Sequence, residues 1–286
     1  MKHEKLFNEE TSIPDIRHLL WERKTNFVNF GLTFMNLIHE LLQSFSPISL
    51  QEMERVKLMN RVDTKFAFTL TELNTLLPSL SDFYHVLKVE ETTTPHYESL
   101  YFDDERFSFF KDHHNSKGNR FKVRIRKYVE SNLFFLEVKH KMKGRTDKKR
   151  IVTDQFNEVL PESDLAFVHK ELQANKNLVP TMWNSFQRIT LVSKTENERL
   201  TLDFNILFEK DGVKKSFKQL VIAELKQEDL NRNSVFYQLM KGQRIRPYRL
   251  SKYCLGSVEI YGEEKLKFNR FKKKLLYLKK INHDAI

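Results

Sequence analysis

Charged and apolar side chains alternate along several stretches of this chain, and this pattern constrains the fold more than any other feature. Between residues 119 and 129 the even positions carry four cations and a tyrosine: Arg120, Lys122, Arg124, Arg126 and Tyr128. Most odd positions are apolar. Because successive side chains of a strand point to opposite faces, this stretch predicts a strand with one cationic and one apolar face.

The same alternation occurs in five further segments. Their charged or polar positions are Arg61, Asp63 and Lys65; Glu137, Lys139 and Lys141; Arg199, Thr201 and Asp203; Glu224 and Lys226; and Arg249 and Ser251. A half-buried sheet with a solvated face also alternates, but six such segments favour a closed or nearly closed sheet with one charge-lined surface. Short polar turns, such as residues 130–132, favour antiparallel pairing.

We predict an α+β fold with strands in the middle of the chain and helices at both ends. The expected strands are 62–68, 84–90, 97–102, 119–129, 133–140, 149–153, 188–194, 199–208, 217–226 and 256–260. The expected helices are 14–46, 50–58, 73–77, 162–174, 180–187, 231–241 and 263–281. The predicted domains are a helical extension (1–49), a central domain (50–262) and a basic helical tail (263–286).

The distribution of charge indicates an anionic partner. The net charge is +11, yet residues 117–150 alone carry 13 Lys and Arg against three acids, and residues 265–286 carry eight against one. Nucleic acid, polyphosphate, nucleotides and membrane surfaces are the partner classes that fit. The tail also fits a solvated helix face.

A single cysteine, Cys254, excludes a disulfide framework within the chain, and we expect it to be a small core residue. His113 and His114 are expected in a polar loop. No signal peptide and no membrane span are evident, so we expect a cytoplasmic protein.

Cations that converge inside a sheet are tolerable only when anions accompany them, since unpaired buried charge is costly. Arginine suits phosphate through bidentate hydrogen bonds, and lysine adds point charge. The interspersed carboxylates Asp63, Glu137, Asp203 and Glu224 are the kind of ligand that Mg²⁺ or Mn²⁺ prefers.

Nine runs of residues, in order along the chain, resemble the VTC domain, the polyphosphate polymerase domain of the vacuolar transporter chaperone complex in the triphosphate tunnel metalloenzyme (CYTH-like) superfamily. These runs are 60–66, 99–103, 120–128, 135–139, 144–150, 187–191, 198–203, 223–226 and 249–253. The resemblance covers about residues 50–260.

The resemblance implies an antiparallel β-tunnel, a closed barrel-like sheet with flanking helices, that binds ATP and polyphosphate. It implies catalytic roles for Arg124, Arg126, Lys139, Arg188 and Glu224. It places along the phosphate path Arg61, Lys65, Arg124, Arg126, Lys139, Lys149, Arg150, Arg188, Arg199, Arg249, Ser251 and Lys252, and leaves open which of Lys149 and Arg150 lines the tunnel. Glu224 would hold Mn²⁺ or Mg²⁺.

The N-terminal motif favours polymerase over hydrolase. Hydrolytic relatives open with Glu-x-Glu-x-Lys, whereas this chain has Arg61-x-Asp63-x-Lys65. The expected activity is therefore metal-dependent transfer of the terminal phosphate of ATP to polyphosphate. Related eukaryotic complexes carry a phosphate-sensing SPX domain and membrane helices; neither is evident here, so product export would need a membrane-protein partner.

Two alternatives remain open: a non-catalytic tunnel that binds polyphosphate or RNA, and a triphosphatase of the same superfamily. Glu224 separates the first from the polymerase, because pure anion binding needs no carboxylate among the cations. Aromatic interleaving for base stacking is not clear on the basic strand faces, which makes nucleic acid an unlikely partner.

Overall fold

The structure, a computed structural model, describes residues 34–55, 61–142 and 145–283. The chain divides into two compact units, Met1–Glu40 and Leu41–Ile286. Residues 34–42 are helical, and the rest of the helical stretch predicted before residue 34 lies outside the described residues. The candidate site belongs to the second unit.

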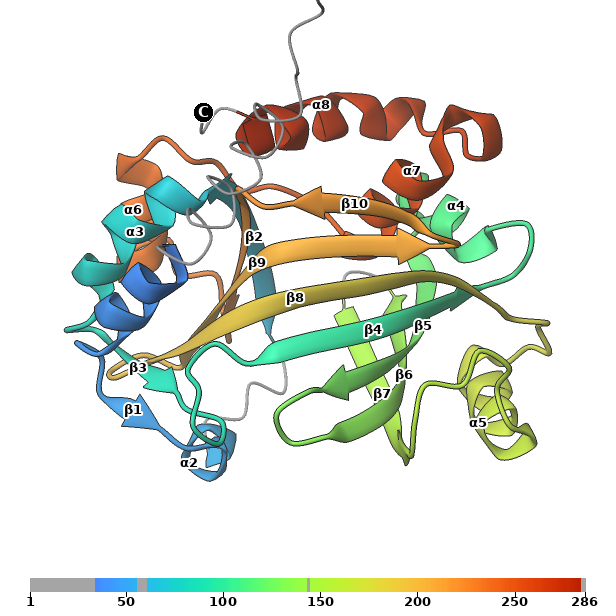
Figure 1. The fold of residues 1–286 in the computed structure, drawn as a ribbon, viewed down its shortest axis with the longest axis horizontal. Coiled ribbons are helices and arrows are strands. Elements are labelled where there is room, and N and C mark those ends of the chain that lie inside the picture. Colours follow the sequence, from blue (N-terminus) through green and yellow to red (C-terminus); the bar gives the residue numbers. More distant parts are fainter. Residues whose placement is uncertain (1–33, 56–60, 143–144, 284–286) are drawn as a thin grey trace, which may run out of the picture. The chain divides into compact units, whose positions relative to one another are not determined.

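A single sheet of eleven strands curls through the second unit (Figure 1). The main path runs β2-β11-β9-β8-β4-β5-β6-β7, and every pairing in it is antiparallel. β10 extends the sheet beside β9, and β1 pairs with β3 in parallel. The strands are β1 (Pro47–Ile48), β2 (Val62–Thr69), β3 (Tyr84–Leu87), β4 (His96–Asp103), β5 (Asn119–Tyr128), β6 (Leu133–Met142), β7 (Arg145–Thr153), β8 (Val179–Ser193), β9 (Glu198–Lys210), β10 (Val213–Phe217) and β11 (Leu220–Gln227).

β2 and β7 are the two ends of this path, and no strand pairing joins them among the described residues. The sheet is therefore strongly curled, in agreement with the predicted α+β fold, but its strand ladder is not continuous around the full circumference.

Helices flank the sheet. They are α2 (Leu50–Arg55), α3 (Leu70–Leu76), α4 (Ser108–His114), α5 (Glu162–Leu172), α6 (Val235–Gly242), α7 (Lys252–Lys265) and α8 (Asn269–His283), with a 3₁₀ turn at Leu77–Leu80. Side chains cap the starts of two of these helices. Ser49 accepts a hydrogen bond from the Glu52 amide at 3.2 Å, and Thr69 and Glu72 form a capping box at α3.

The apolar side chains on one face of the strands form the core. Val123 and Ile125 of β5 and Leu136 and Val138 of β6 are buried. They belong to one hydrophobic cluster that includes residues of α4, α5, α7 and α8. Because the apolar face packs against helices, the charged side chains at the alternate positions of the same strands point to the inside of the curled sheet.

Two predicted elements were assigned to the wrong class. Residues 180–187 were expected to be helical, but they belong to β8. Their backbone pairs with β4 on one side and β9 on the other, and this tertiary pairing overrides the local spacing.

Residues 256–260 were expected to be a strand but lie in α7, which begins at the N-cap Ser251. A Cβ on Gly256 would lie 2.3 Å from Sδ of Met182, so the absent side chain lets the helix approach the sheet closely.

Two local elements also differ from the sequence reading. His113 and His114 were expected in a loop, but they end α4, whose Phe109 and Phe110 face the core. β10 was not predicted as a separate strand. The prediction that Cys254 is a core residue is confirmed, since it is buried.

Candidate functional site

A cavity of about 610 Å³ lies inside the curled sheet. Its described lining includes twelve cationic and four anionic side chains. The cations are Arg61, Lys65, Lys122, Arg124, Arg126, Lys139, Lys148, Arg150, Arg188, Arg199, Lys226 and Lys252, and the anions are Glu130, Glu137, Asp203 and Glu224. Such an excess of positive charge in an enclosed space is suited to a polyanion.

The structure brings most of the predicted site residues to this cavity. Those that line it are Arg61, Lys65, Arg124, Arg126, Lys139, Arg150, Arg188, Arg199, Glu224, Ser251 and Lys252. The expectation that Arg124, Arg126, Glu137 and Lys139 share one enclosed space is confirmed.

Lys149 and Arg249 do not belong to the described cavity lining. In the β6–β7 pairing, Arg150 lies opposite Glu137, which faces the cavity, whereas Lys149 lies opposite Val138, which is in the core. Arg150 is therefore the neighbour that faces inward. Arg249 is exposed, just before the lining residues Leu250 and Ser251.

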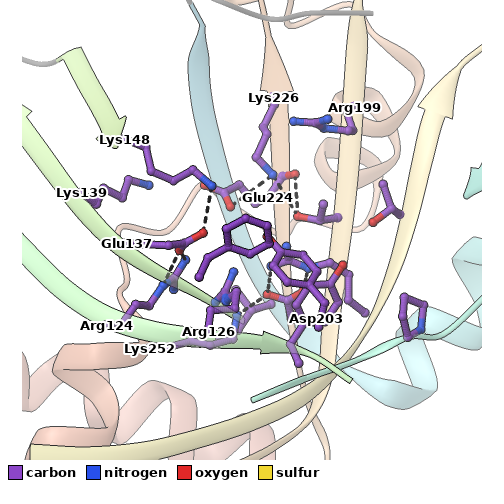
Figure 2. A pocket seen from close by; sticks show the side chains of 18 of the residues that line it. Arg124, Arg126, Glu137, Lys139, Lys148, Arg199, Asp203, Glu224, Lys226 and Lys252 are labelled. Atoms are coloured by element: carbon purple, nitrogen blue, oxygen red, sulfur yellow. Dashed lines mark hydrogen bonds and ion pairs between the residues drawn. The ribbon is translucent and has the colours of Figure 1, made fainter. Parts of the chain in front are cut away.

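Three carboxylates each hold two cations (Figure 2). Glu137 accepts hydrogen bonds from Nε and Nη2 of Arg124, at 2.8 and 2.6 Å, and from Nζ of Lys148 at 3.0 Å. Asp203 accepts from Nε and Nη2 of Arg188, at 2.5 and 2.8 Å, and pairs with Lys252. These clamps fix the cations that they hold.

Glu224 is the third of these carboxylates. It pairs with Lys65, which lies directly opposite on β2, and with Nζ of Lys226 at 3.4 Å. Burial raises the pKa of Glu224, but Lys226, Lys65 and Lys139 outweigh burial and hold the pKa well below its usual range. Glu224 is therefore a permanent anion at neutral pH.

A row of three lysines crosses the cavity wall, and among the described residues only Lys148 has an ion pair, with Glu137. Lys122 of β5 lies opposite Lys139 of β6, and Lys139 lies opposite Lys148 of β7. Burial lowers the pKa of Lys122 to about 7 and the pKa of Lys139 to about 8. Like charges directly across a ladder destabilise it, so this row favours an anion between the side chains.

Several cations lie over aromatic rings. The guanidinium of Arg126 lies 5.6 Å from the ring centroids of both Tyr97 and Phe186, and that of Arg188 lies 4.9 Å from Tyr97. Arg150 lies 4.4 Å from the centroid of Phe135. Aromatic side chains that were not clear from the sequence therefore do lie among the cations. These rings come from the strands beside the cations and carry guanidinium groups, so they orient cations.

One part of the cavity is apolar. Its lining includes Leu50 and Met53 of α2, Leu87 and Val89 at the end of β3, and Leu133 at the start of β6. The site thus combines a cationic region with a region that can contact an uncharged, flat or apolar group.

Sequence reasoning missed three cations of the lining: Lys122, Lys148 and Lys226. Burial lowers the pKa of Lys226 to about 7. The alternation of side chains along a strand could have identified them. Each lies two positions from a predicted site residue of the same strand, and therefore on the same face: Arg124, Arg150 and Glu224, respectively.

The carboxylates of the described chain do not form a metal cage, since no three His, Cys, Asp or Glu side chains cluster closely enough to hold an ion. Magnesium is commonly held by one or two carboxylates together with substrate phosphates and water. Glu224 fits this second arrangement, with Asp63 diagonally across the β2–β11 pair as the nearest acid in that ladder. No helix in the described ranges is long and apolar enough to span a membrane.

Comparison with known proteins finds one family. The sequence model of the VTC domain matches residues 60–261, whereas no curated protein matches significantly. A solved structure of a suggested adenylate cyclase from Bacillus halodurans has a TM-score of 0.48 at 13% identity and covers 71% of this chain and 98% of its own. A second suggested adenylate cyclase, from Vibrio parahaemolyticus, has a TM-score of 0.41 at 11% identity, with coverages of 68% and 96%. The PH1012 protein of Pyrococcus horikoshii has a TM-score of 0.38 at 13% identity, with coverages of 68% and 98%.

Proposed function

This chain belongs to the VTC domain family, and we propose that it is a metal-dependent polyphosphate polymerase, which transfers the terminal phosphate of ATP to a growing polyphosphate chain. The observation that carries the proposal is the row of Lys122, Lys139 and Lys148 inside an enclosed cavity, beside the anchored anion Glu224. A linear chain of phosphates supplies one negative charge after another and so matches a line of cations.

The proposed catalytic cations act by positioning and by charge. Phosphoryl transfer asks for in-line placement and for neutralisation of the charge on the transferring group. Arg124 and Arg188 are held rigidly by Glu137 and Asp203, so they keep their orientation before the substrate arrives. Arg126 and Lys139 make no ion pair in the described part of the chain, and both are left for phosphate oxygens.

Glu224 is the proposed anchor for Mg²⁺ or Mn²⁺. Such an ion would neutralise charge on the phosphate oxygens that share it. Lys65 and Lys226 would have to release one oxygen of Glu224 for the ion, and phosphate oxygens are the natural new partners of these lysines.

The nucleoside of ATP is proposed to lie in the apolar part of the cavity, against Leu50, Met53, Leu87 and Val89. This placement puts the triphosphate among the cations. Export of a long product across a membrane would require a further protein, and a cytoplasmic location remains part of the proposal.

Incubation of the purified protein with ATP and Mn²⁺ or Mg²⁺ tests the function. We expect long phosphate chains on a gel and release of ADP, both abolished by a chelator. Release of orthophosphate without chains would identify a triphosphatase, and no consumption of ATP despite tight polyphosphate binding would identify a binding module.

The binding module is favoured by one specific observation. Both oxygens of Glu224 already face lysines, an arrangement that also serves to orient Lys65 and Lys226 without any metal. The Glu224 variant described in the Discussion separates these two readings.

A further inference from the structure

The cationic wall of β5 and β6 continues beyond the cavity. Arg120 lies directly opposite Lys141, one inward-facing step past the pair of Lys122 and Lys139. Two residues of strand span about 7 Å, so the outer pair continues the line of the inner pair. Neither Arg120 nor Lys141 belongs to the described lining of the cavity.

Neither Arg120 nor Lys141 makes an ion pair among the described residues, although Nη1 of Arg120 donates a hydrogen bond to the Lys117 carbonyl. Like charges directly across a ladder repel each other. Nε of Arg120 is buried and has no hydrogen-bond partner among the described residues. The nearby acid Asp63 already pairs with Arg61 at 3.0 Å. An unpartnered donor in a pair of like charges points to an anionic ligand.

Two more cations extend the line toward α8. Arg249 is exposed and directly precedes the cavity-lining Leu250, and Nζ of Lys274 donates a hydrogen bond to the Arg249 carbonyl at 2.9 Å. Burial and Arg120 lower the pKa of Lys141, and the charge of Arg249 lowers it further. Burial also lowers the pKa of Lys274, and Arg249 is again a further cause. Arg249 therefore lies near both Lys141 and Lys274 and links the strand pair to α8.

We propose that Arg120, Lys141, Arg249 and Lys274 form an outer track that binds the part of a long polyphosphate chain lying outside the cavity. The inference rests on the proposed function, because it takes polyphosphate as the ligand of the cavity. It also makes a distinct claim: the track holds long chains and has no contact with a ligand of three phosphates.

The test compares two ligands on the same variants. The variants are Lys141→Met and Arg249→Met, made singly and together. Each removes a positive charge from the track, and the backbone carbonyl of residue 249, which accepts a hydrogen bond from Lys274, is kept. A matched control, Lys215→Met with Lys273→Met, removes two exposed lysines of β10 and α8 that do not line the cavity. Binding is measured by calorimetry with tripolyphosphate and with chains of several tens of phosphates.

For the double track variant we expect affinity for long chains to fall by at least about tenfold, affinity for tripolyphosphate to stay within twofold, and the salt dependence of long-chain binding to become shallower. The control variant should change neither affinity by more than twofold. An equal loss for both ligands would overturn the proposal by placing these side chains in the short-ligand site. An unchanged affinity for long chains would overturn it as well.

The failure of the proposed function is distinguishable from these results, because the binding test requires no turnover. If the unaltered protein makes no polyphosphate but the track variant loses affinity for long chains, the outer track is supported and the polymerase proposal fails. Absence of any polyphosphate binding by the unaltered protein would overturn both.

Discussion

At the scale of single residues, Arg124 and Arg126 show that neighbouring cations of one strand have different roles. Arg124 is clamped by Glu137, whereas Arg126 makes no ion pair with the described residues; it donates a hydrogen bond to the hydroxyl of Ser99 at 3.2 Å and lies over the rings of Tyr97 and Phe186. Burial and the neighbouring Arg124 lower the pKa of Arg126, which indicates that this charge is held at a cost in folding free energy.

We expect Arg126→Ala to weaken tripolyphosphate binding by about 1.5–3 kcal/mol, the scale of hydrogen bonds to charged groups, with no loss of thermal stability. Arg124→Ala should lose similar affinity and also lower the melting temperature, because Glu137, which is 1% exposed, would keep only Lys148. Calorimetry and thermal unfolding of both variants check this. Unchanged affinity in both would remove these arginines from the site.

Glu224→Gln preserves shape and removes the proposed metal anchor. We expect metal-dependent ATP consumption to fall at least about 100-fold, on the order of 3 kcal/mol, while binding of metal-free polyphosphate persists or tightens. If Glu224 instead only orients Lys65 and Lys226, polyphosphate binding falls and the metal dependence stays. Retained turnover with Mn²⁺ would take Glu224 out of the mechanism.

At the scale of elements, the alternation of charge in residues 119–129 and 133–140 was enough to predict both strands and the side chains that share each face, whereas the inward direction of the charged face was implied by the family resemblance. The choice between Lys149 and Arg150 was not accessible in the same way, because it depends on the register of β7 against β6. The aromatic partners of Arg126 come from β4 and β8, which are distant from β5 in sequence, so the local sequence pattern of β5 cannot predict them.

The two misassigned elements meet each other. Met182 of β8 and Gly256 of α7 lie in contact, and both predictions failed because tertiary packing outweighed local spacing. The start of α7 carries Ser251 and Lys252 into the cavity, so this contact also positions part of the site.

Gly256→Ala should therefore destabilise the fold by about 1–3 kcal/mol through overpacking against Met182 and Phe208. A Met182→Ala change in the same chain should recover part of the loss relative to the sum of the two single variants. Denaturant unfolding measures all three proteins. Full stability of Gly256→Ala alone would show that α7 has room to shift.

At the scale of the whole molecule, the buried lysines couple stability to pH. Burial lowers the pKa to about 7 for Lys122 and Lys226, and to about 8 for Lys139 and Lys252, against about 10.4 in an unfolded chain. Between pH 7 and 10 the unfolded chain binds more protons at these positions, so the free energy of unfolding rises with pH in that window.

Without ligand, we expect a higher melting temperature at pH 9 than at pH 7. Saturating tripolyphosphate should shrink this difference, because it keeps the lysines charged. Its binding at pH 8 should also take up protons, which calorimetry in two buffers of different ionisation enthalpy detects. A Lys122→Met, Lys226→Met variant should show a smaller rise with pH; an equal rise would assign the effect to other groups.

The limits of the predicted domains, 1–49, 50–262 and 263–286, remain predictions. The family match at residues 60–261 lies wholly within the central one. The tail contributes Lys274 to the neighbourhood of Arg249, so a truncation at residue 262 would remove one side of the proposed outer track.

The unpaired ends of the sheet have a topological consequence. In the described part of the chain, β2 and β7 share no ladder, so the wall around the cavity is a split ring. A sealed ring admits a polymer only by threading from a free end. A split ring has no such requirement as far as its backbone hydrogen bonding is concerned, so we expect that a preformed chain can also enter from the side. A circular polyphosphate, which has no end to thread, would distinguish the two modes of entry.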